Sequence, residues 1–462
     1  MTATETHTRE SRVSSSRSRR TLLVASLGFF LITLDILIVT VALTRIGRDL
    51  GGGTTGQQWV VDGYTLMFAS LLLFAGNLSD RVGAKSAFAV GIILFLLASI
   101  ACAAAPTLGT LIAARFVQGS GAAIMLPASM ALIREAYPDD RKRAHALGIW
   151  AVGGAVAGAV GPLLGGLLTT IDWRLAFAIN LPMCAAMLVL LAPTARSTPR
   201  PAPFDWGGQL TAIVALAALT YGLIEGGANG FSDTVVVFAL VVAVVGIVAF
   251  LVIQARGRHP MMPLDLFRSS GMRISLGVGF SFMVANFGSV FVASLYLQQH
   301  LGLSPLLAGL VFLPSAAFSV TGNIVSGTLA NRYGPRVPVI AGLTCMAIGL
   351  VALLITAPSD NPLLVGALLI LTGAGGAVSM PQVASVVLAS EPANRAGTAS
   401  AAFNTFRQVG GAVAIAVFGA LLADPATFVQ GMQVSFAIAA GLLLISAIAS
   451  IFLSPIGYTA RK

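Results

Sequence analysis

The sequence has little charge. Only 10% of its 462 residues are Asp, Glu, Lys or Arg, against roughly 25% in ordinary soluble domains. This scarcity excludes a soluble globular protein, a disordered chain and a nucleic-acid-binding protein. The three cysteines and four histidines form no CxxC motif and no ligand-spaced pair, so neither a disulfide framework nor a metal site is expected. A GxxxxGK[ST] loop is also missing, which argues against ATP hydrolysis.

Apolar residues are correspondingly abundant. They make up 56% of the chain, and the mean hydropathy is +0.90. A helix that crosses a bilayer needs about 20 apolar residues, and fourteen segments meet that need. We therefore expect an all-α integral membrane protein with fourteen transmembrane helices. The segments are 22–43, 58–78, 86–104, 108–133, 146–169, 175–191, 209–225, 234–254, 274–298, 308–329, 337–356, 363–388, 399–422 and 434–453.

The basic residues predict the orientation. With the N-terminus inside, 22 of the 27 Lys and Arg fall in the tails and the loops on the cytoplasmic side, and only three fall on the other side. This bias places both termini in the cytoplasm and the chain in the plasma (inner) membrane. It also explains the net charge of +10 without an anionic partner. Residues 1–20, rich in Ser and Arg, predict a disordered cytoplasmic tail, and residues 457–462 form a second tail.

Two pairs of segments indicate an internal repeat. Residues 76–85 match 327–336 in their glycines, an arginine and the final basic residue, at an offset of 251. Residues 119–127 resemble 373–381 at an offset of 254. Each match falls at the same place within its half of the chain. Small-residue helix faces resemble one another by chance, but the match between the charged loops is harder to explain that way.

The repeat predicts the domain organisation. We expect an N-terminal six-helix bundle over 21–193, a linker with two extra transmembrane helices over 194–258, and a C-terminal six-helix bundle over 259–456. Repeated halves that face each other across a membrane are the architecture of alternating-access transporters, which bind their cargo near the midplane.

Several motifs together resemble one family. They are Gly76, Asp80, Arg81, Gly83 and Lys85 (motif A); Arg115, Gln118, Gly119 and Gly121 (motif B); Gly153, Gly161, Pro162, Gly165 and Gly166 (motif C); and residues 34–43. With them the chain resembles the major facilitator superfamily, specifically its fourteen-span drug:proton antiporters, and looks closest to methylenomycin-resistance-type exporters. Leu37, Thr40 and Thr44 depart from that group's usual pattern.

The resemblance implies roles for the motifs. Motif A would form a charge network that latches the two halves on the cytoplasmic side, and motif C would be an antiport element. Physical reasoning alone offers simpler readings. Gly76 and Gly83 allow close helix approach and a tight turn. The charged loop of motif A could simply be solvated, with no latching role. The glycine-rich face of motif C could simply be a surface on which helices pack.

A charge within a span is costly and indicates a functional site. We expect Asp35 to be the main proton-coupling residue and Asp62 to assist it, because burial shifts carboxyl pKa values towards neutrality. Asp35 could instead be structural, and Asp62 could lie at the membrane interface. By resemblance, Arg115 would help proton transfer by holding down the pKa of a nearby carboxylate, for which Asp35 and Asp62 are the candidates. The alternative is a structural Arg115 that bonds backbone carbonyls. Glu225 is expected at an exposed helix end.

The expected activity is proton-coupled efflux of small amphipathic compounds such as antibiotics. The alternative is a symporter or metabolite exchanger on the same fold, since fold alone does not set direction. An enzyme is not expected. We expect no cofactor besides the proton motive force, no nucleic acid, and a monomer in the lipid bilayer. Asp35 offers a negative charge to monocations. Candidate cavity residues are Gln57, Gln58, Tyr64, Asn286, Tyr296, Asn323, Asn404 and Arg407.

Overall fold

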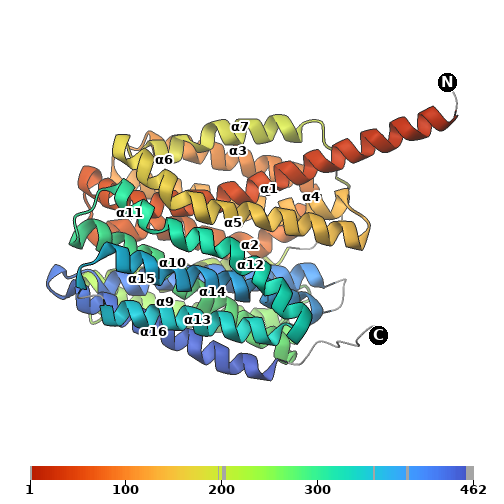
Figure 1. Ribbon diagram of the computed structural model, residues 1–462. Helices are drawn as coiled ribbons and strands as arrows, with labels where there is room; N and C mark the ends of the chain where they lie inside the picture. The colour runs from red at the N-terminus through yellow and green to blue at the C-terminus, as the bar shows by residue number, and fades with distance from the viewer. Residues whose placement is uncertain (1–2, 196, 200–203, 357–358, 392–394, 454–462) are drawn as a thin grey trace.

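The computed structural model describes residues 3–195, 197–199, 204–356, 359–391 and 395–453. Long helices lie side by side in one bundle, and α1 projects beyond it at its N-terminal end (Figure 1). We call that end of the bundle proximal and the opposite end distal. The helices are α1 (Ala3–Leu50), α2 (Gly53–Val82), α3 (Ala84–Ala103), α4 (Leu108–Ala136), α5 (Asp140–Ile171), α6 (Leu175–Ala178), α7 (Asn180–Leu191), α8 (Trp206–Asn229), α9 (Thr234–Arg256), α10 (Ser270–Leu295), α11 (Pro305–Val311), α12 (Leu313–Tyr333), α13 (Arg336–Thr356), α14 (Pro362–Ala389), α15 (Ala396–Leu421) and α16 (Phe428–Ala449).

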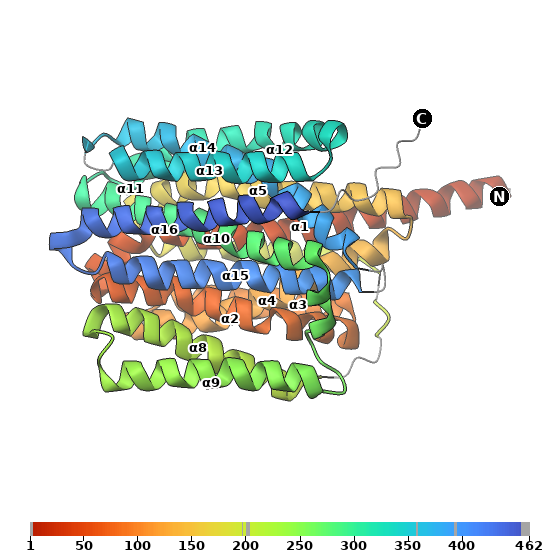
Figure 2. The ribbon, with the colours of Figure 1, turned by 90° about the horizontal axis from the view of Figure 1, so that it is seen from below.

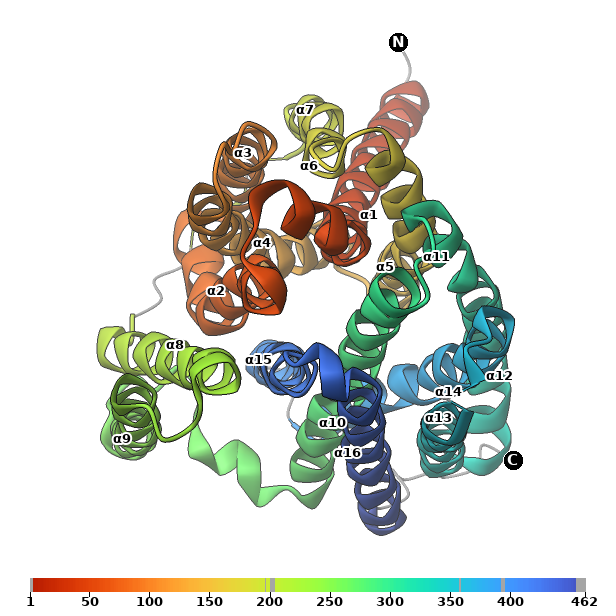
Figure 3. The ribbon, with the colours of Figure 1, turned by 90° about the vertical axis from the view of Figure 1, so that its left-hand side faces the viewer.

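The helices form two groups. Seen from the distal end, α1–α7 gather on one side and α10–α16 on the other (Figure 3). Helices α8 and α9 pack as a pair, and α8 contacts both α2 and α15, so that α9 forms an outer edge of the bundle (Figure 2). The groups meet where α2 packs against α15 and where α5 packs against α11 and α12.

The helices have the length and composition of membrane spans. Among the described residues, twelve helices are long and apolar enough to cross a bilayer. The two other expected spans fall on the pair α6 and α7, which forms a shorter apolar helix over Leu175–Leu191, and on α15, which carries polar side chains. The chain is therefore a multi-pass, all-helical membrane protein.

Two expected spans are interrupted by proline. The segment 175–191 divides into α6 and α7, and the segment 308–329 begins within α11 and continues in α12. Pro182 and Pro314 each lack the N–H that would bond the carbonyl four residues earlier. In both cases that carbonyl, of Ala178 or of Leu310, lies at the break, so each interruption has a local cause in the sequence.

The N-terminal segment differs from the expectation. Residues 1–20 were predicted to be disordered, but α1 is helical from Ala3 onwards. Helix propagation explains the difference, because extending an existing helix adds one hydrogen bond per residue without a new nucleation cost. Near its proximal end this helix contacts α4, where Ser18 Oγ donates to the Ala136 carbonyl at 3.1 Å.

The internal repeat reappears in the packing. A Cβ atom built on Gly91 of α3 would lie 3.0 Å from the carbonyl oxygen of Gly121 of α4. A Cβ atom on Gly342 of α13 would meet the carbonyl oxygen of Gly375 of α14 in the same way. Gly342 follows Gly91 by 251 residues, and Gly375 follows Gly121 by 254. The two groups thus share the same glycine-mediated helix contact at the offsets found in the sequence.

Candidate functional site: a buried ion pair and an apolar pocket

Asp35 lies in the middle of α1 with its side chain fully buried. Its Oδ2 atom pairs with Nη1 of Arg115 from α4 at 2.5 Å. Its Oδ1 atom accepts hydrogen bonds from Gln118 Nε2 at 2.8 Å and from Asn180 Nδ2 at 2.7 Å. One carboxylate therefore joins α1 to both α4 and α7, and three donors surround it, which suits a negative charge.

A second layer holds the donors in place. The Ser99 hydroxyl on α3 accepts from Gln118 Nε2 at 3.0 Å and from Asn180 Nδ2 at 3.3 Å, and it donates to the Phe95 carbonyl at 2.8 Å. Because both amides donate to Ser99 as well as to Asp35, their orientations are fixed by two acceptors each. Four helices of the first group therefore share one polar network.

Arg115 is fully buried as well. Its Nε donates to the Val60 carbonyl at 2.9 Å and its Nη1 also donates to Gln118 Oε1 at 2.8 Å. The guanidinium lies 4.4 Å above the ring of Tyr64, a distance typical of cation–π contacts. Nη2 has no hydrogen-bond partner in the described part of the chain. Both partners considered from the sequence, an acid and a backbone carbonyl, are thus present.

Asp62 lies apart from this network. It is fully buried in α2, and Thr65 Oγ1 donates to its Oδ1 at 2.9 Å. Its Oδ2 has no partner among the described residues. Asp62 is one turn of α2 from Gln58, whose Nε2 donates to the Ala416 carbonyl of α15 at 2.8 Å. The second acid therefore lies near the junction of the two helical groups.

Polar contacts close the distal side of this junction. Gln298 Nε2 donates to the Val41 carbonyl at 3.0 Å, and Ser294 Oγ donates to the Thr40 carbonyl at 3.3 Å. Gln299 Nε2 donates to Gln57 Oε1 at 3.1 Å. Each bond joins the first group of helices to the second, so Gln57 and Gln58 act here as closing contacts between the groups.

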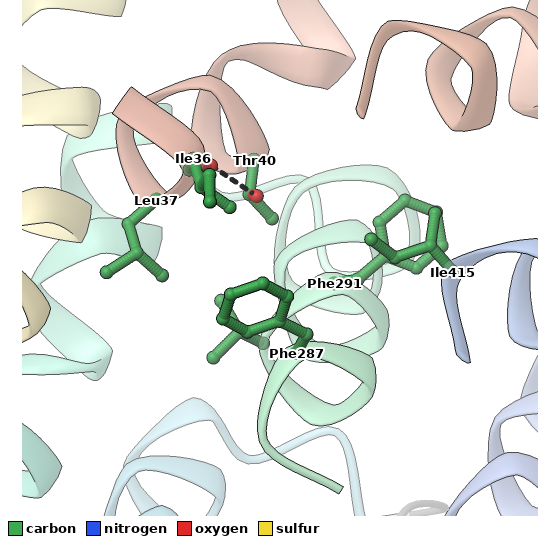
Figure 4. Close-up of a pocket in the computed structure, with 7 residues that line it drawn as sticks. Ile36, Leu37, Thr40, Phe287, Phe291 and Ile415 are labelled. Carbon is green, nitrogen blue, oxygen red and sulfur yellow. Dashed lines mark hydrogen bonds between the residues drawn. The ribbon is translucent and has the colours of Figure 1, made fainter. Parts of the chain in front are cut away.

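An apolar pocket lies between the groups, beside this closure (Figure 4). Ile36 and Thr40 of α1 are matched across it by Phe287 and Phe291 of α10, again 251 residues later. The Thr40 hydroxyl is used within α1, where it donates to the Ile36 carbonyl at 2.8 Å. The residues that line the pocket are Ile36, Leu37, Thr40, Phe287, Val290, Phe291 and Ile415.

None of the eight candidate cavity residues is among these seven. Tyr64 is buried under Arg115, and Tyr296 donates to Asp360 Oδ1 at 3.1 Å at the distal end. Asn323 is exposed and bonded to its own helix. Asn286 lies on α10, and Asn404 and Arg407 lie on α15, both helices of the second group. The sequence reasoning missed the apolar lining because it searched for polar side chains, although the repeat offset links its α1 and α10 members.

Comparison with known proteins agrees with this architecture. The family model described as Major Facilitator Superfamily matches residues 25–415. The chain is 38% identical to the multidrug resistance protein Stp of Mycobacterium tuberculosis, over 87% of this chain and 75% of that protein. It is 38% identical to the methylenomycin A resistance protein of Streptomyces coelicolor, over 90% of this chain and 88% of that one. The chain belongs to the major facilitator superfamily.

Solved structures agree on the fold. A crystal structure of a POT family transporter, in complex with a thioalcohol-conjugated peptide, superposes with a TM-score of 0.72 at 14% identity. The match covers 94% of this chain and 97% of that one. Membership of this superfamily makes the chain a transporter rather than an enzyme.

The superfamily's motif A sits at the proximal end, between α2 and α3. Gly83 has a φ of 85°, a conformation that favours glycine, whereas a Cβ atom on Gly76 would meet nothing within 4 Å. Lys85 Nζ donates to the Ala192 and Thr194 carbonyls, both at 2.8 Å, just beyond the end of α7. The expected tight turn is therefore present at Gly83, but no close helix approach occurs at Gly76.

Within the described residues, the charges of motif A do not bridge the two groups. Arg81 lies 4.9 Å above the ring of Phe204, in the segment that leads into α8. Asp80 is exposed and makes no ion pair in the described part of the chain. In this conformation, which is closed at the distal side, the loop fastens α3 to α7 and to the linker. A latch to the second group would have to form in another conformation.

Motif C packs α5 closely against neighbouring helices. Cβ atoms on Gly161 and Gly165 would lie 2.7 Å from Leu37 Cβ and 2.9 Å from the Ile38 carbonyl oxygen of α1. Gly166 faces Pro305 of α11, and Gly153 faces Ser26 of α1. Pro162 faces α11 as well, because its carbonyl oxygen lies against Gly309. Motif C thus holds α1 of the first group and α11 of the second against one helix.

Glu225 differs from its expected place. It lies inside α8, is half-buried, and accepts from Trp59 Nε1 at 2.9 Å and from Asn229 Nδ2 at 3.1 Å. Since α8 continues to Asn229, Glu225 is not an exposed helix end. Its bond to Trp59 attaches α8 to α2.

Proposed function

We propose that this chain is a proton-coupled exporter of small amphipathic compounds such as antibiotics or drugs. The observation that carries the proposal is the fully buried Asp35–Arg115 pair, in a chain of this superfamily that is 34–38% identical to proteins named for drug resistance. A buried ion pair is costly to maintain and within a membrane indicates a functional site. The names of these relatives support export rather than uptake.

The proposed topology has fourteen membrane crossings. Two six-span bundles related by the repeat enclose the cargo site, and α8 and α9 are linker helices inserted between them. The bias of Lys and Arg supports a cytoplasmic proximal end, with both termini inside, in the plasma membrane. The protein would work as a monomer in the bilayer, with the proton motive force as its only energy source, no cofactor and no nucleic acid.

Proton binding at Asp35 would change which conformation is stable. A proton on the carboxylate removes its negative charge and leaves Arg115 buried with neutral acceptors only. Removing one partner of a buried ion pair costs about 3–5 kcal/mol, which is enough to shift a two-state equilibrium by more than a hundredfold. The deprotonated pair therefore stabilises the distal-closed conformation, and protonation favours a different one.

Asp62 would assist as a second proton site. A buried carboxylate without a cation is unfavourable unless it holds a proton, and no described cation pairs with Asp62. Its position one turn from Gln58 places it near the contacts that must break when the distal side opens. Proton uptake by Asp62 from the outside would thus be tied to that opening.

The experiment that tests this function uses inverted membrane vesicles with an acid interior and a pH-sensitive dye. Addition of antibiotics and amphipathic dyes to vesicles with the wild-type chain is expected to release protons, and Asp35→Asn is expected to abolish the signal. Asp233→Asn is the matched control, since Asp233 caps α9 through Val235 N at 2.9 Å and Asn caps equally well. Proton release that persists in well-folded Asp35→Asn would overturn the role of Asp35, and no release with any compound would overturn export.

A further inference from the structure

Arg407 is a cation within the helical bundle, and no acid among the described residues pairs with it. It lies on α15, half-buried, and its Nη1 donates to Asn404 Oδ1 at 3.2 Å. Its guanidinium lies 5.9 Å from the ring of Phe282 and 5.7 Å from that of Phe403. Its Nε is enclosed without a hydrogen-bond partner, and no described carboxylate is within ion-pair distance. A buried cation of this kind is expensive unless something completes its shell.

The position of Arg407 connects it to the pocket. Ile415, which lines the pocket, follows Arg407 by eight residues on α15, about two turns or 12 Å along the same helix face. Between them lies Gly411, where a Cβ atom would be 2.9 Å from the ring of Phe287, another lining residue. The guanidinium therefore lies on the proximal side of the pocket, on the face of α15 that also carries Ile415.

An unused amide lies between the cation and the pocket. Asn286 of α10 follows Phe282 by one turn and precedes Val290 by one turn, so it separates the ring beside Arg407 from the pocket lining. Asn286 is half-buried, and its side chain makes no hydrogen bond within the described residues. It follows Asp35 by 251 residues, so the second group has a neutral amide where the first has the paired acid.

The nearby carboxylates in the described structure do not neutralise Arg407. Asp35 is neutralised by Arg115 and so offers no free charge to a monocation, contrary to the expectation from the sequence. Glu225 faces Trp59 and Asn229, and Asp62 is on α2 with Thr65 as its donor. None of these three carboxylates pairs with Arg407 in the described structure.

We propose that Arg407, Asn404 and Asn286 form a subsite for a carboxylate of the cargo, whose apolar body packs against the pocket-lining residues Phe287 and Ile415. A guanidinium matches a carboxylate through two parallel hydrogen bonds, and the free Nε offers one of them. The cargo class is then an amphipathic monoanion with an apolar ring or chain. This inference rests on the proposed export function, since the anion is taken as the exported compound.

The test compares an acid with its uncharged twin. The probes are dansylglycine and dansylglycinamide, which share one apolar body and differ in the carboxylate. Their fluorescence is titrated with the purified full chain in nanodiscs of zwitterionic lipid, so that no anionic lipid competes for Arg407. The wild type is expected to bind the acid about tenfold more tightly than the amide or better, since hydrogen bonds to charged groups are the stronger class.

Variants assign the preference to Arg407. Arg407→Gln is expected to bind acid and amide equally, whereas Arg407→Lys, which keeps the charge without the fork of donors, is expected to retain a reduced preference. Arg256→Gln is the matched control, because Arg256 is exposed at the end of α9. The inference is overturned if the wild type binds the acid no more tightly than the amide. It is also overturned if Arg407→Gln, with an unfolding temperature like that of the wild type, keeps the preference.

The two proposals fail separately. If drugs release protons from wild-type vesicles but the acid shows no preference, export stands and the carboxylate subsite is wrong. If the acid preference depends on Arg407 but no compound releases protons, the subsite stands and antiport is wrong. Added anionic lipid is expected to leave the acid's Kd unchanged, and strong competition would show that a lipid headgroup, not cargo, occupies Arg407.

Discussion

Asn286 occupies in α10 the position that Asp35 occupies in α1. The two residues are 251 apart, the offset that also relates the two motif A loops and the paired pocket residues Ile36 and Phe287. Asp35 is saturated by three donors, whereas the Asn286 side chain has none in the described structure. Equivalent sites in the two groups are therefore chemically different, and this difference underlies both proposals.

The Asp35–Arg115 pair should behave as a unit in stability measurements. Arg115→Leu leaves a buried carboxylate without its cation and is expected to cost about 3–5 kcal/mol of folding stability. The double variant Asp35→Asn, Arg115→Leu is expected to recover much of that loss, since no charge remains buried, but to show no substrate-driven proton movement. Unfolding temperatures in detergent measure the first effect. A double variant less stable than Arg115→Leu would contradict the pairing.

Alanine substitutions should destabilise the protein only at glycines that lie in a close contact between helices. Gly121→Ala is expected to lower the unfolding temperature, because its Cβ atom would lie 2.8 Å from the Phe95 backbone nitrogen and 3.0 Å from the Gly91 carbonyl oxygen. Gly76→Ala is expected to be tolerated, since nothing lies within 4 Å of that position. Scanning fluorimetry of both variants makes the comparison, and equal effects would count against the helix contact described here.

Lys85 should matter more than Asp80 for the stability of this conformation. Lys85→Met removes two hydrogen bonds to carbonyls beyond the end of α7, each worth about 1.5–3 kcal/mol at most for a charged donor and less where solvent reaches it. Asp80→Asn is expected to leave the unfolding temperature unchanged. Should Asp80→Asn impair transport without affecting stability, its partner exists only in a conformation with the distal side open.

The distal contacts should hold the two groups together. Cysteines in place of Gln57 and Gln299, whose side chains meet at 3.1 Å, are expected to react with a short bifunctional thiol reagent and to block transport until the link is reduced. Either single cysteine variant serves as the control. Full transport by the linked protein would show that the distal side need not open.

An ion pair outside the spans should give a pH signature. Arg395, just before α15, donates to Asp265, and this hydrogen bond lowers the pKa of the Asp265 carboxyl. A lowered folded-state pKa stabilises the fold above the ordinary Asp pKa of about 3.9, and the gain is lost as the pH falls through the lowered value. Between about pH 5 and about pH 3, the unfolding temperature of the wild type should fall more steeply than that of Arg395→Gln. Because the pair is exposed, the difference should be small, and parallel curves would contradict it.

Much of the fold follows from the sequence because helix length and hydropathy act locally. The apolar segments, the repeat offsets and the turn at Gly83 were all predictable from short stretches of residues. The breaks before Pro182 and Pro314 had the same local basis, although the span limits did not anticipate them. The helical start of α1 was not predicted, because a Ser- and Arg-rich composition carries little helix signal by itself.

The site was less predictable because it depends on long-range contacts. A charge in a span identified Asp35 and Arg115, but their 2.5 Å contact links residues 80 positions apart. Asn180 is 145 positions from Asp35, and nothing in its spacing shows that the two side chains form a hydrogen bond. Glu225 was misplaced because its partner Trp59 is on another helix. The pocket escaped notice because its lining carries no charge.

The pocket, which is lined by repeat-related residues of α1 and α10, also bears on how such a protein can evolve. The ion pair belongs to the first group of helices, while three pocket residues of α10 and the nearby Arg407 belong to the second. In the proposed mechanism, mutations at Phe287, Val290 or Phe291 would reshape the surface that meets the cargo without touching Asp35 or its donors. A population facing new toxins would then explore new specificities in one half, while the proposed proton-coupling residues of the other half stay unchanged.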